Sequence, residues 1–195
     1  MSEPKGLGNM GYLSKRELHK LDFVSLGKDV LISERASLDK SEMMSIGDFS
    51  RIDDFCAVSG NVQIGRNVHF AVHCSVTASR ESASFGDFSG LAMSCHIFTS
   101  SDDYSGISLT NPTVPAEFKE INHGAISIGR HVIIGAASLV FPGVVVAEGC
   151  SVGAFSLVNQ STEPWGIYAG IPATRRKDRS KDLLLLEKKY LNGDS

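Results

Sequence analysis

A histidine and two adjacent carboxylates mark the part of this chain that is suited to proton transfer. His69 stands in a regular stretch of the sequence, and Asp102 and Asp103 stand in an irregular stretch further on. Imidazole is the side chain best tuned for removing a proton near neutral pH. A carboxylate can hold an imidazole in the orientation that this requires. We therefore predict that His69 is a general base, oriented by Asp102 or Asp103 of the same chain or of a neighbouring one.

Further polar side chains near the irregular stretch are suited to binding the hydroxyl groups of a substrate. They are His73, His96, Tyr104, Asn111 and His123. The alternative interpretation is that the histidines are ordinary surface or packing residues and that Tyr104 and Asn111 only fold their own loop. The sequence contains no P-loop, nucleophile motif or metal-binding cluster, so we predict no resident metal.

A six-residue repeat supplies the elements that must position these side chains. Its clearest run has an aliphatic residue at every sixth position: Ile128, Ile134, Val140, Val146, Val152 and Val158. Neither a helix, with its period of about 3.6, nor an alternating strand produces a period of six. The period therefore indicates a repeated supersecondary unit.

Interruptions of the repeat predict the architecture. The earlier repeat positions fall into blocks of three, six and three before the final block of six. Three hexads per turn would build a three-sided prism with the interruptions at its corners. We predict an all-β, parallel β-helix over residues 26–158, with residues 98–127 as an inserted active-site loop. Glycine follows many repeat positions, as at Gly47 and Gly65, where we expect a bend with positive φ.

Four cysteines occupy equivalent slots of the repeat. Cys56, Cys74, Cys95 and Cys150 each stand two residues before a repeat position. This slot favours small buried side chains, so we expect free thiols in a reducing compartment. The first three should stack in successive turns, at a spacing that would also permit a disulfide.

The two ends of the chain differ from the repeat. Residues 1–25 are predicted to form a flexible arm and a short helix over residues 14–21, with Ser14 as its cap and Glu17 three residues later. Residues 159–195 are predicted to form a tail and a short amphipathic helix that covers the open end of the β-helix.

Composition limits the class of protein. The 195 residues are 42% hydrophobic and 21% charged, with a formal net charge of -3, which is typical of one globular domain. A net charge near zero does not indicate the basic surface that binds nucleic acid, and no apolar run reaches the length of a membrane span. Since the first residues lack an apolar signal core, we expect a cytoplasmic protein with no membrane insertion.

The repeat and its C-terminal continuation resemble one known family. Hexads that begin with Ile or Val and Gly, followed by the stretch Ala169-Gly-Ile-Pro-Ala173, resemble the left-handed β-helix, or hexapeptide-repeat, acyltransferases over most of the chain. The chain looks most like the galactoside, maltose and polysaccharide-cluster O-acetyltransferases. This resemblance implies an acetyl-CoA-dependent homotrimer with active sites between subunits, which acetylates a hydroxyl of a sugar or polysaccharide precursor.

The resemblance also implies where acetyl-CoA would lie. Slots that match the family's pantetheine groove and nucleotide phosphate site are Gly135, Ala136, Gly153, Ala154, Asn159, Gln160, Thr174, Arg175, Arg176 and Lys177. Guanidinium groups suit phosphate oxygens, although a basic run of this kind can also be an ordinary solvated tail.

Two departures from the family pattern leave other functions open. The family's general-base histidine corresponds to Asp102 here, and an asparagine that assists substrate positioning corresponds to Ala71. One alternative is N-acetylation of a nucleotide-linked amino sugar, because an amine attacks with less help from the protein. Others are a noncatalytic β-helix scaffold and a trimeric metalloenzyme with His69, His96 and His123 as metal ligands across the trimer interface.

Overall fold

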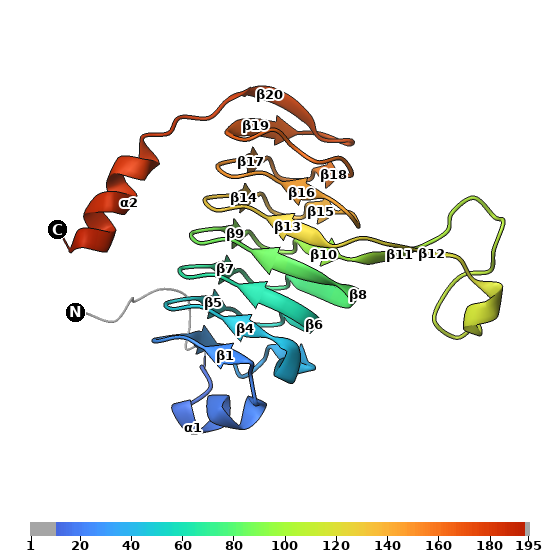
Figure 1. Cartoon of the computed structure of the whole chain (residues 1–195), viewed down its shortest axis with the longest axis horizontal. Helices are drawn as coiled ribbons and strands as arrows, with labels where there is room; N and C mark the ends of the chain where they lie inside the picture. The colour runs from blue at the N-terminus through green and yellow to red at the C-terminus, as the bar shows by residue number, and fades with distance from the viewer. Residues whose placement is uncertain (1–10, 194–195) are drawn as a thin grey trace.

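The computed structural model describes residues 11–193 as a β-helix of about seven turns (Figure 1). The predicted fold class, a left-handed parallel β-helix with a long inserted loop and a short C-terminal helix, is confirmed. Residues 1–10, for which we predict a flexible arm, lie outside the described part of the chain.

Three columns of parallel strands form the three faces of the prism. The first face contains β1 (Ser25–Leu26), β4 (Ser45–Ile46), the C-terminal halves of β6 (Ala57–Ile64) and β8 (Ser75–Phe85), β13 (Ile126–Ile128) and β16 (Val145–Val146). The second face contains β2 (Leu31–Ile32), β5 (Arg51–Ile52), β7 (His69–Phe70), β9 (Gly90–Leu91), β14 (Ile133–Ile134), β17 (Ser151–Val152) and β19 (Gly166–Ala169). The third face contains β3 (Ser37–Asp39), the N-terminal halves of β6 and β8, β10 (His96–Phe98), β15 (Leu139–Val140) and β18 (Leu157–Val158).

The repeat positions fill the interior of the prism. Ile52, Phe70 and Leu91 stack in register on the second face, and each is about 1% exposed. The residue directly before each of them points outward, whereas the residue two before it is also buried, so the outward position is available for binding or catalysis. All four cysteines are buried and unpaired by disulfides, as the small-residue slot predicts.

The glycines after the repeat positions have a different role from the one expected. Gly47 does not have a positive φ, but a Cβ there would lie 2.5 Å from the carbonyl carbon of Gly65 in the next turn. Glycine is therefore required by close contact between turns. The positive φ falls two residues later, at Phe49, Asn67 and His131 among others.

The interruptions lie at one corner, between the third and first faces. The longest forms an antiparallel hairpin of β11 (Ser100–Asp102) and β12 (Ile121–His123), which carries the short helix η3 (Ala116–Phe118). This hairpin projects away from the prism (Figure 1). The shorter interruptions are η2 (Ser41–Met43) and the extra residues of β8 between Ala78 and Ala83, which shift its register with β6 after Gly60.

The N-terminal helix forms as predicted. α1 (Lys15–Leu18) begins with a capping box in which the side chains of Ser14 and Glu17 bond each other's backbone N–H groups, and η1 (His19–Leu21) continues it. Leu18 is buried against the first turn, so the helix covers that end of the core.

The C-terminal helix α2 (Leu183–Asn192) does not cover the last turn, and that part of the prediction is wrong. It runs down the side of the prism (Figure 1), and β20 (Thr174–Asp178) pairs with β19 instead. The cause is a specific attachment to the corner between the first and second faces. Glu187 is buried there, 3.1 Å from His131 Nε2 and ion-paired with Arg130, and Tyr190 packs edge-on against Phe88.

This attachment is expected to weaken in acid. Arg130 and then His131 hold the pKa of Glu187 below its ordinary value of 4.5. A depressed carboxyl pKa stabilises the folded state above the unfolded pKa, and that contribution is lost as pH falls through the folded pKa. We expect α2 to detach below pH 4.5, reported by fluorescence of Trp165, which lies 6.5 Å from the His131 ring. Glu187→Gln should abolish the acid transition, and an unchanged transition would contradict this explanation.

Candidate active site

His69 projects from β7 on the second face and is held by a buried carboxylate. Its Nε2 atom lies 2.7 Å from Oδ2 of Asp53, whose side chain is only 5% exposed. Asp53 is in turn held by Arg51, with 2.9 Å between Nε of Arg51 and Oδ1 of Asp53. A partly exposed imidazole fixed by a buried carboxylate is an arrangement that suits a general base.

A groove of about 500 Å³ runs beside His69, between the second face and α2. Gly90 stands directly above His69 in the same column and leaves its outward slot empty. Ile133 of the next turn and Leu186 and Tyr190 of α2 provide an apolar wall. The groove therefore offers a polar end at His69 and an apolar surface beside it.

The predicted partners of His69 lie elsewhere in the chain. Asp102 accepts the backbone N–H of Asn111 at 3.2 Å, and Asp103 accepts hydrogen bonds from the backbone N–H and hydroxyl of Ser105. The Ser105 hydrogen bonds lower the pKa of Asp103. Within one chain, both carboxylates order the projecting hairpin, and the pairing of either with His69 is not observed.

Asp53 was not predicted from the sequence as a site residue, although the repeat places it close to His69. Arg51 and His69 are separated by one complete turn of three hexads, and the structure pairs them directly. Asp53 follows the repeat position Ile52 and so stands at the edge of the same column. Counting outward slots turn by turn would have brought Arg51 and His69 together, with Asp53 two residues after Arg51.

The predicted substrate-binding residues are dispersed within one chain. His73 stacks on Phe55 at the corner between the second and third faces, with 5.0 Å between ring centroids. His96 lies on the third face with Nδ1 2.7 Å from the hydroxyl of Ser75. His123, Tyr104 and Asn111 belong to the projecting hairpin, where Tyr104 is 87% exposed and the Asn111 side chain accepts from Thr113. Of the predicted catalytic and substrate-binding residues, all within residues 11–193, only Asn111 and Asp102 are joined by a hydrogen bond.

The predicted CoA-binding slots of the last turns lie at two corners of the prism. Gly135 and Ala136 share the corner between the second and third faces with Gly153 and Ala154, and a Cβ on Gly135 would lie 2.4 Å from the Ala154 nitrogen. Asn159 and Gln160 are exposed just after β18, at the corner between the third and first faces.

The basic run on β20 is partly engaged within the chain. Thr174 and Lys177 are exposed, whereas Arg175 pairs with Asp178 at 2.8 Å and Arg176 donates to the carbonyl of Ala169 at 3.0 Å. Both guanidinium groups remain at the surface, so a phosphate would compete with these partners.

Arg179, next to the predicted basic run, has a structural role that the sequence did not reveal. It donates to the carbonyls of His131, Gly149 and Cys150, and burial lowers the pKa of Arg179. These bonds fix the segment that leads into α2.

A metal centre is not formed by the described part of a single chain. Residues 11–193 contain no group of three His, Cys, Asp or Glu side chains placed to hold a metal ion. His69, His96 and His123 lie on three separate elements. No helix within those residues is long and apolar enough to cross a membrane.

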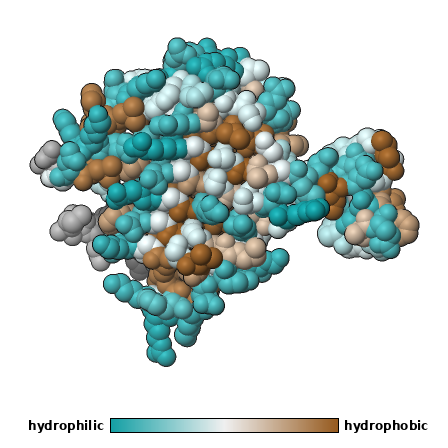
Figure 2. Space-filling view, in the orientation of Figure 1, coloured by the Kyte–Doolittle hydropathy of each residue, from teal (hydrophilic) through white to brown (hydrophobic). Residues whose placement is uncertain are grey.

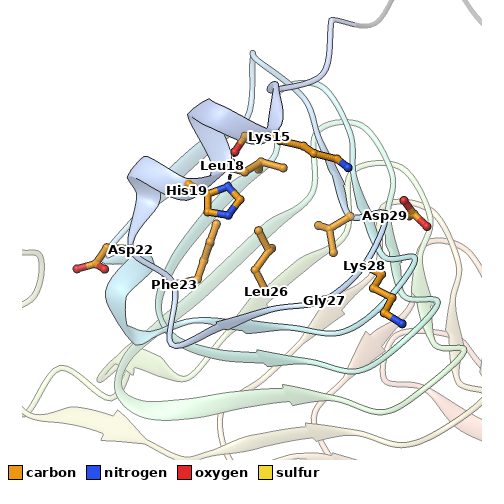
Figure 3. Close-up of a pocket in the computed structure, with 10 residues that line it drawn as sticks. Lys15, Leu18, His19, Asp22, Phe23, Leu26, Gly27, Lys28 and Asp29 are labelled. Atoms are coloured by element: carbon orange, nitrogen blue, oxygen red, sulfur yellow. Dashed lines mark hydrogen bonds between the residues drawn. The ribbon is translucent and has the colours of Figure 1, made fainter.

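A second cavity, also of about 500 Å³, lies at the N-terminal end of the prism (Figure 3). It is formed by α1, η1 and the first turn, and His19 is held above it by a 2.6 Å bond from Nδ1 to the carbonyl of Lys15. It contains none of the predicted site residues and lies at the opposite end from β19 and β20 (Figure 1).

Comparisons with known proteins agree with this architecture. No protein-family model matches the chain. The chain is 39% identical over 181 residues to the dTDP-4-amino-4,6-dideoxy-D-glucose acyltransferase of Escherichia coli, which covers 91% of this chain and 94% of that protein.

Solved structures show the same relationship. AntD, an N-acyltransferase from Bacillus cereus in complex with dTDP and 3-hydroxybutyryl-CoA, is 39% identical with a TM-score of 0.92, over 93% of this chain and 97% of that one. A variant of AntD in complex with dTDP-4-amino-4,6-dideoxyglucose and coenzyme A has a TM-score of 0.94 at 38% identity, over 95% and 100% of the two chains. A maltose O-acetyltransferase from Clostridium difficile shares the fold, at 19% identity and a TM-score of 0.56, over 86% and 75%.

Sequence, structure and comparison agree on the family: the chain has the hexad repeat and the three-sided prism, and one relative matches it almost from end to end. The chain belongs to the hexapeptide-repeat β-helix family of acyl-CoA-dependent acyltransferases.

Proposed function

We propose that this enzyme transfers an acyl group from acyl-CoA to the amine of a nucleotide-linked amino sugar. The observation that carries the proposal is the near full-length similarity to an acyltransferase of a dTDP-linked amino sugar. Asp102 at the slot of the O-acetyltransferase histidine agrees with it. O-acetylation, the leading interpretation of the sequence, has weaker support, because the maltose O-acetyltransferase shares only the fold.

The chemistry of an amine explains why the usual histidine is dispensable. A neutral amine attacks the thioester carbonyl with its own lone pair, whereas a hydroxyl must lose its proton during attack. The new C–N bond forms as the C–S bond breaks, and CoA leaves as a thiolate that takes up a proton. The protein must hold both substrates in line and accept the proton that the amine releases. In this proposal, His69 is the acceptor.

The acyl-CoA would lie along the third face, between the corner at Gly135 and the corner at Gln160. The N–H of Gly135 donates to the carbonyl of Val152, so the neighbouring amide of half-buried Ala136 is proposed to polarise the thioester oxygen. Thr174, Arg175, Arg176 and Lys177 would then meet the phosphates at the end of the prism. Because AntD binds 3-hydroxybutyryl-CoA, acyl groups larger than acetyl belong in the test.

The active enzyme is proposed to be a homotrimer with a shared site. The projecting hairpin carries exposed apolar side chains that no other part of residues 11–193 covers, including Ile107 at 82% and Leu109 at 57% exposure, and Figure 2 shows apolar surface on this lobe. The outward slots of the second and third faces also expose Ile133 and Leu139. Packing one prism against the next would bury these surfaces and place Asp102 and Asp103 near the neighbour's groove.

Acceptor specificity is tested with matched sugars. We expect turnover of a dTDP-linked amino sugar to exceed that of its hydroxyl analogue by about 10²-fold or more, because only the amine is nucleophilic without prior deprotonation. Thiol release from acetyl-CoA and 3-hydroxybutyryl-CoA would be measured with both acceptors. A preference for the hydroxyl analogue would restore the O-acetyltransferase interpretation, and no transfer to either would favour a scaffold.

The shared site is tested by mixing two inactive variants. His69→Ala and Asp102→Ala subunits would be co-expressed and purified through different tags. If the two residues act across an interface, each mixed trimer retains one intact site of its three, so about a third of the activity returns. A mixture as inactive as its components would place both residues in one subunit's site or remove Asp102 from catalysis.

A further inference from the structure

The contacts of His69 define which of its nitrogens carries the proton. Nε2 lies 2.7 Å from Asp53 Oδ2 and 2.9 Å from Nη2 of Arg51. A guanidinium can only donate and an ionised carboxylate can only accept, so the two contacts require opposite states of Nε2.

Arg51 has another acceptor, which removes the conflict. Its Nη2 atom lies 3.1 Å from Asp53 Oδ2, and its Nε atom lies 2.9 Å from Oδ1. Nη2 donates to Oδ2, whereas Nε and Oδ1 are close enough for an ion pair but form no hydrogen bond. The bond from Nε2–H to the carboxylate is the shorter contact and is charge-assisted. When Nε2 carries the proton, Oδ2 therefore accepts from both His69 and Arg51.

The other nitrogen is then free to accept a proton. Among residues 11–193, no hydrogen-bond partner is found for Nδ1 of His69. The side chain is 41% exposed and lines the groove beside Gly90, whose missing side chain leaves room for a substrate.

We propose that Asp53 is a positioning residue that fixes the Nε2–H tautomer of His69, so that Nδ1 accepts the proton released by the substrate amine. Arg51 holds Asp53 in place from the opposite side. The inference rests on the proposed function, because it gives His69 the role of base, and it adds the atom and the second residue on which that role depends.

The variant that tests this is Asp53→Asn. The new side chain has nearly the same shape, and its one oxygen can take the place of Oδ1 beside Nε of Arg51, which puts the amide nitrogen in the place of Oδ2 against His69. That nitrogen donates, which forces Nε2 to accept and moves the proton to Nδ1. We expect kcat with a dTDP-linked amino sugar to fall about 10²-fold or more while KM changes less than about threefold.

Asp54→Asn is the matched control. Asp54 is the adjacent residue and is also buried, but it bonds Ser33 and Arg35 and has no contact with His69. Thermal unfolding of both variants separates loss of stability from loss of orientation. We expect kcat of Asp54→Asn to stay within about threefold of the wild type.

A second readout does not depend on activity. Nitrogen-15 NMR of the full chain without substrate, with His69 assigned by its loss in His69→Ala, should show the proton on Nε2 in the wild type and on Nδ1 in Asp53→Asn. An unchanged tautomer, or a kcat equal to that of the Asp54→Asn control, would overturn the proposal. If the wild type fails to acylate amino sugars, the proposed function fails, while the tautomer measurement still decides the role of Asp53.

Discussion

Replacing His69 by alanine is expected to lower kcat about 10²- to 10⁴-fold, which is the usual contribution of a general base. Thiol release from acyl-CoA with a dTDP-linked amino sugar measures the loss. His69 lies on the outside of the prism, and the core position beside it is Phe70, so the fold should not change. Circular dichroism and the molar mass in solution are expected to equal those of the wild type.

His19→Ala serves as the control for this experiment. His19 is also an exposed histidine with one hydrogen bond, but it lies in the N-terminal cavity away from the groove. Its replacement should leave the rate within about twofold of the wild type, as for a surface substitution. Wild-type turnover of His69→Ala would refute the assignment of His69 as base and turn attention to Asp102 and Asp103.

Replacing Phe70 by alanine is expected to destabilise the fold by about 3–5 kcal/mol. Phe70 is one of the largest fully buried side chains, and its ring meets that of Phe85 edge-on with 4.7 Å between centroids. A single prism has a narrow core, so adjacent turns have little freedom to collapse into the cavity. For a chain of this length, the loss corresponds to a fall in Tm of about 6–20 °C.

Phe155→Ala is the comparison for Phe70→Ala. Phe155 occupies a corner and is 71% exposed, so its removal should cost less than about 0.5 kcal/mol in an isolated subunit. Thermal unfolding would be followed by circular dichroism at several protein concentrations, because association stabilises the folded state. Equal Tm values for the two variants would show that the stack of repeat positions does not dominate stability.

The fold could be predicted from the sequence because its determinants are local and repeated. The aliphatic position of each hexad shows which residue faces inward. The number of hexads between interruptions is a multiple of three, which indicates three faces per turn. The capping box at Ser14 and the buried thiols are equally local, since each depends on residues at a fixed spacing. These predictions agree with the structure.

The path of α2 could not be predicted in the same way. Its leucines favour an amphipathic helix, but they could pack against any apolar surface and so do not specify which one. In the structure, Leu185 and Leu186 remain about two-thirds exposed. The position is decided by Glu187, whose partners Arg130 and His131 are distant in the sequence. A buried carboxylate requires such partners, and only the folded chain shows where they are.

The sequence by itself therefore determined the β-helix, the position of the inserted loop and the family, because these depend on periodicity and short motifs. The role of His69 as base stays a prediction. Only the tertiary structure decided that Asp53 and Arg51 hold this imidazole, and that Asp102 and Asp103 order a hairpin within their own chain. The physical reason is that a hydrogen bond depends on which side chains adjacent turns bring within about 3 Å of each other, and a repeat fixes the stacking of turns without specifying the polar residues in its outward slots.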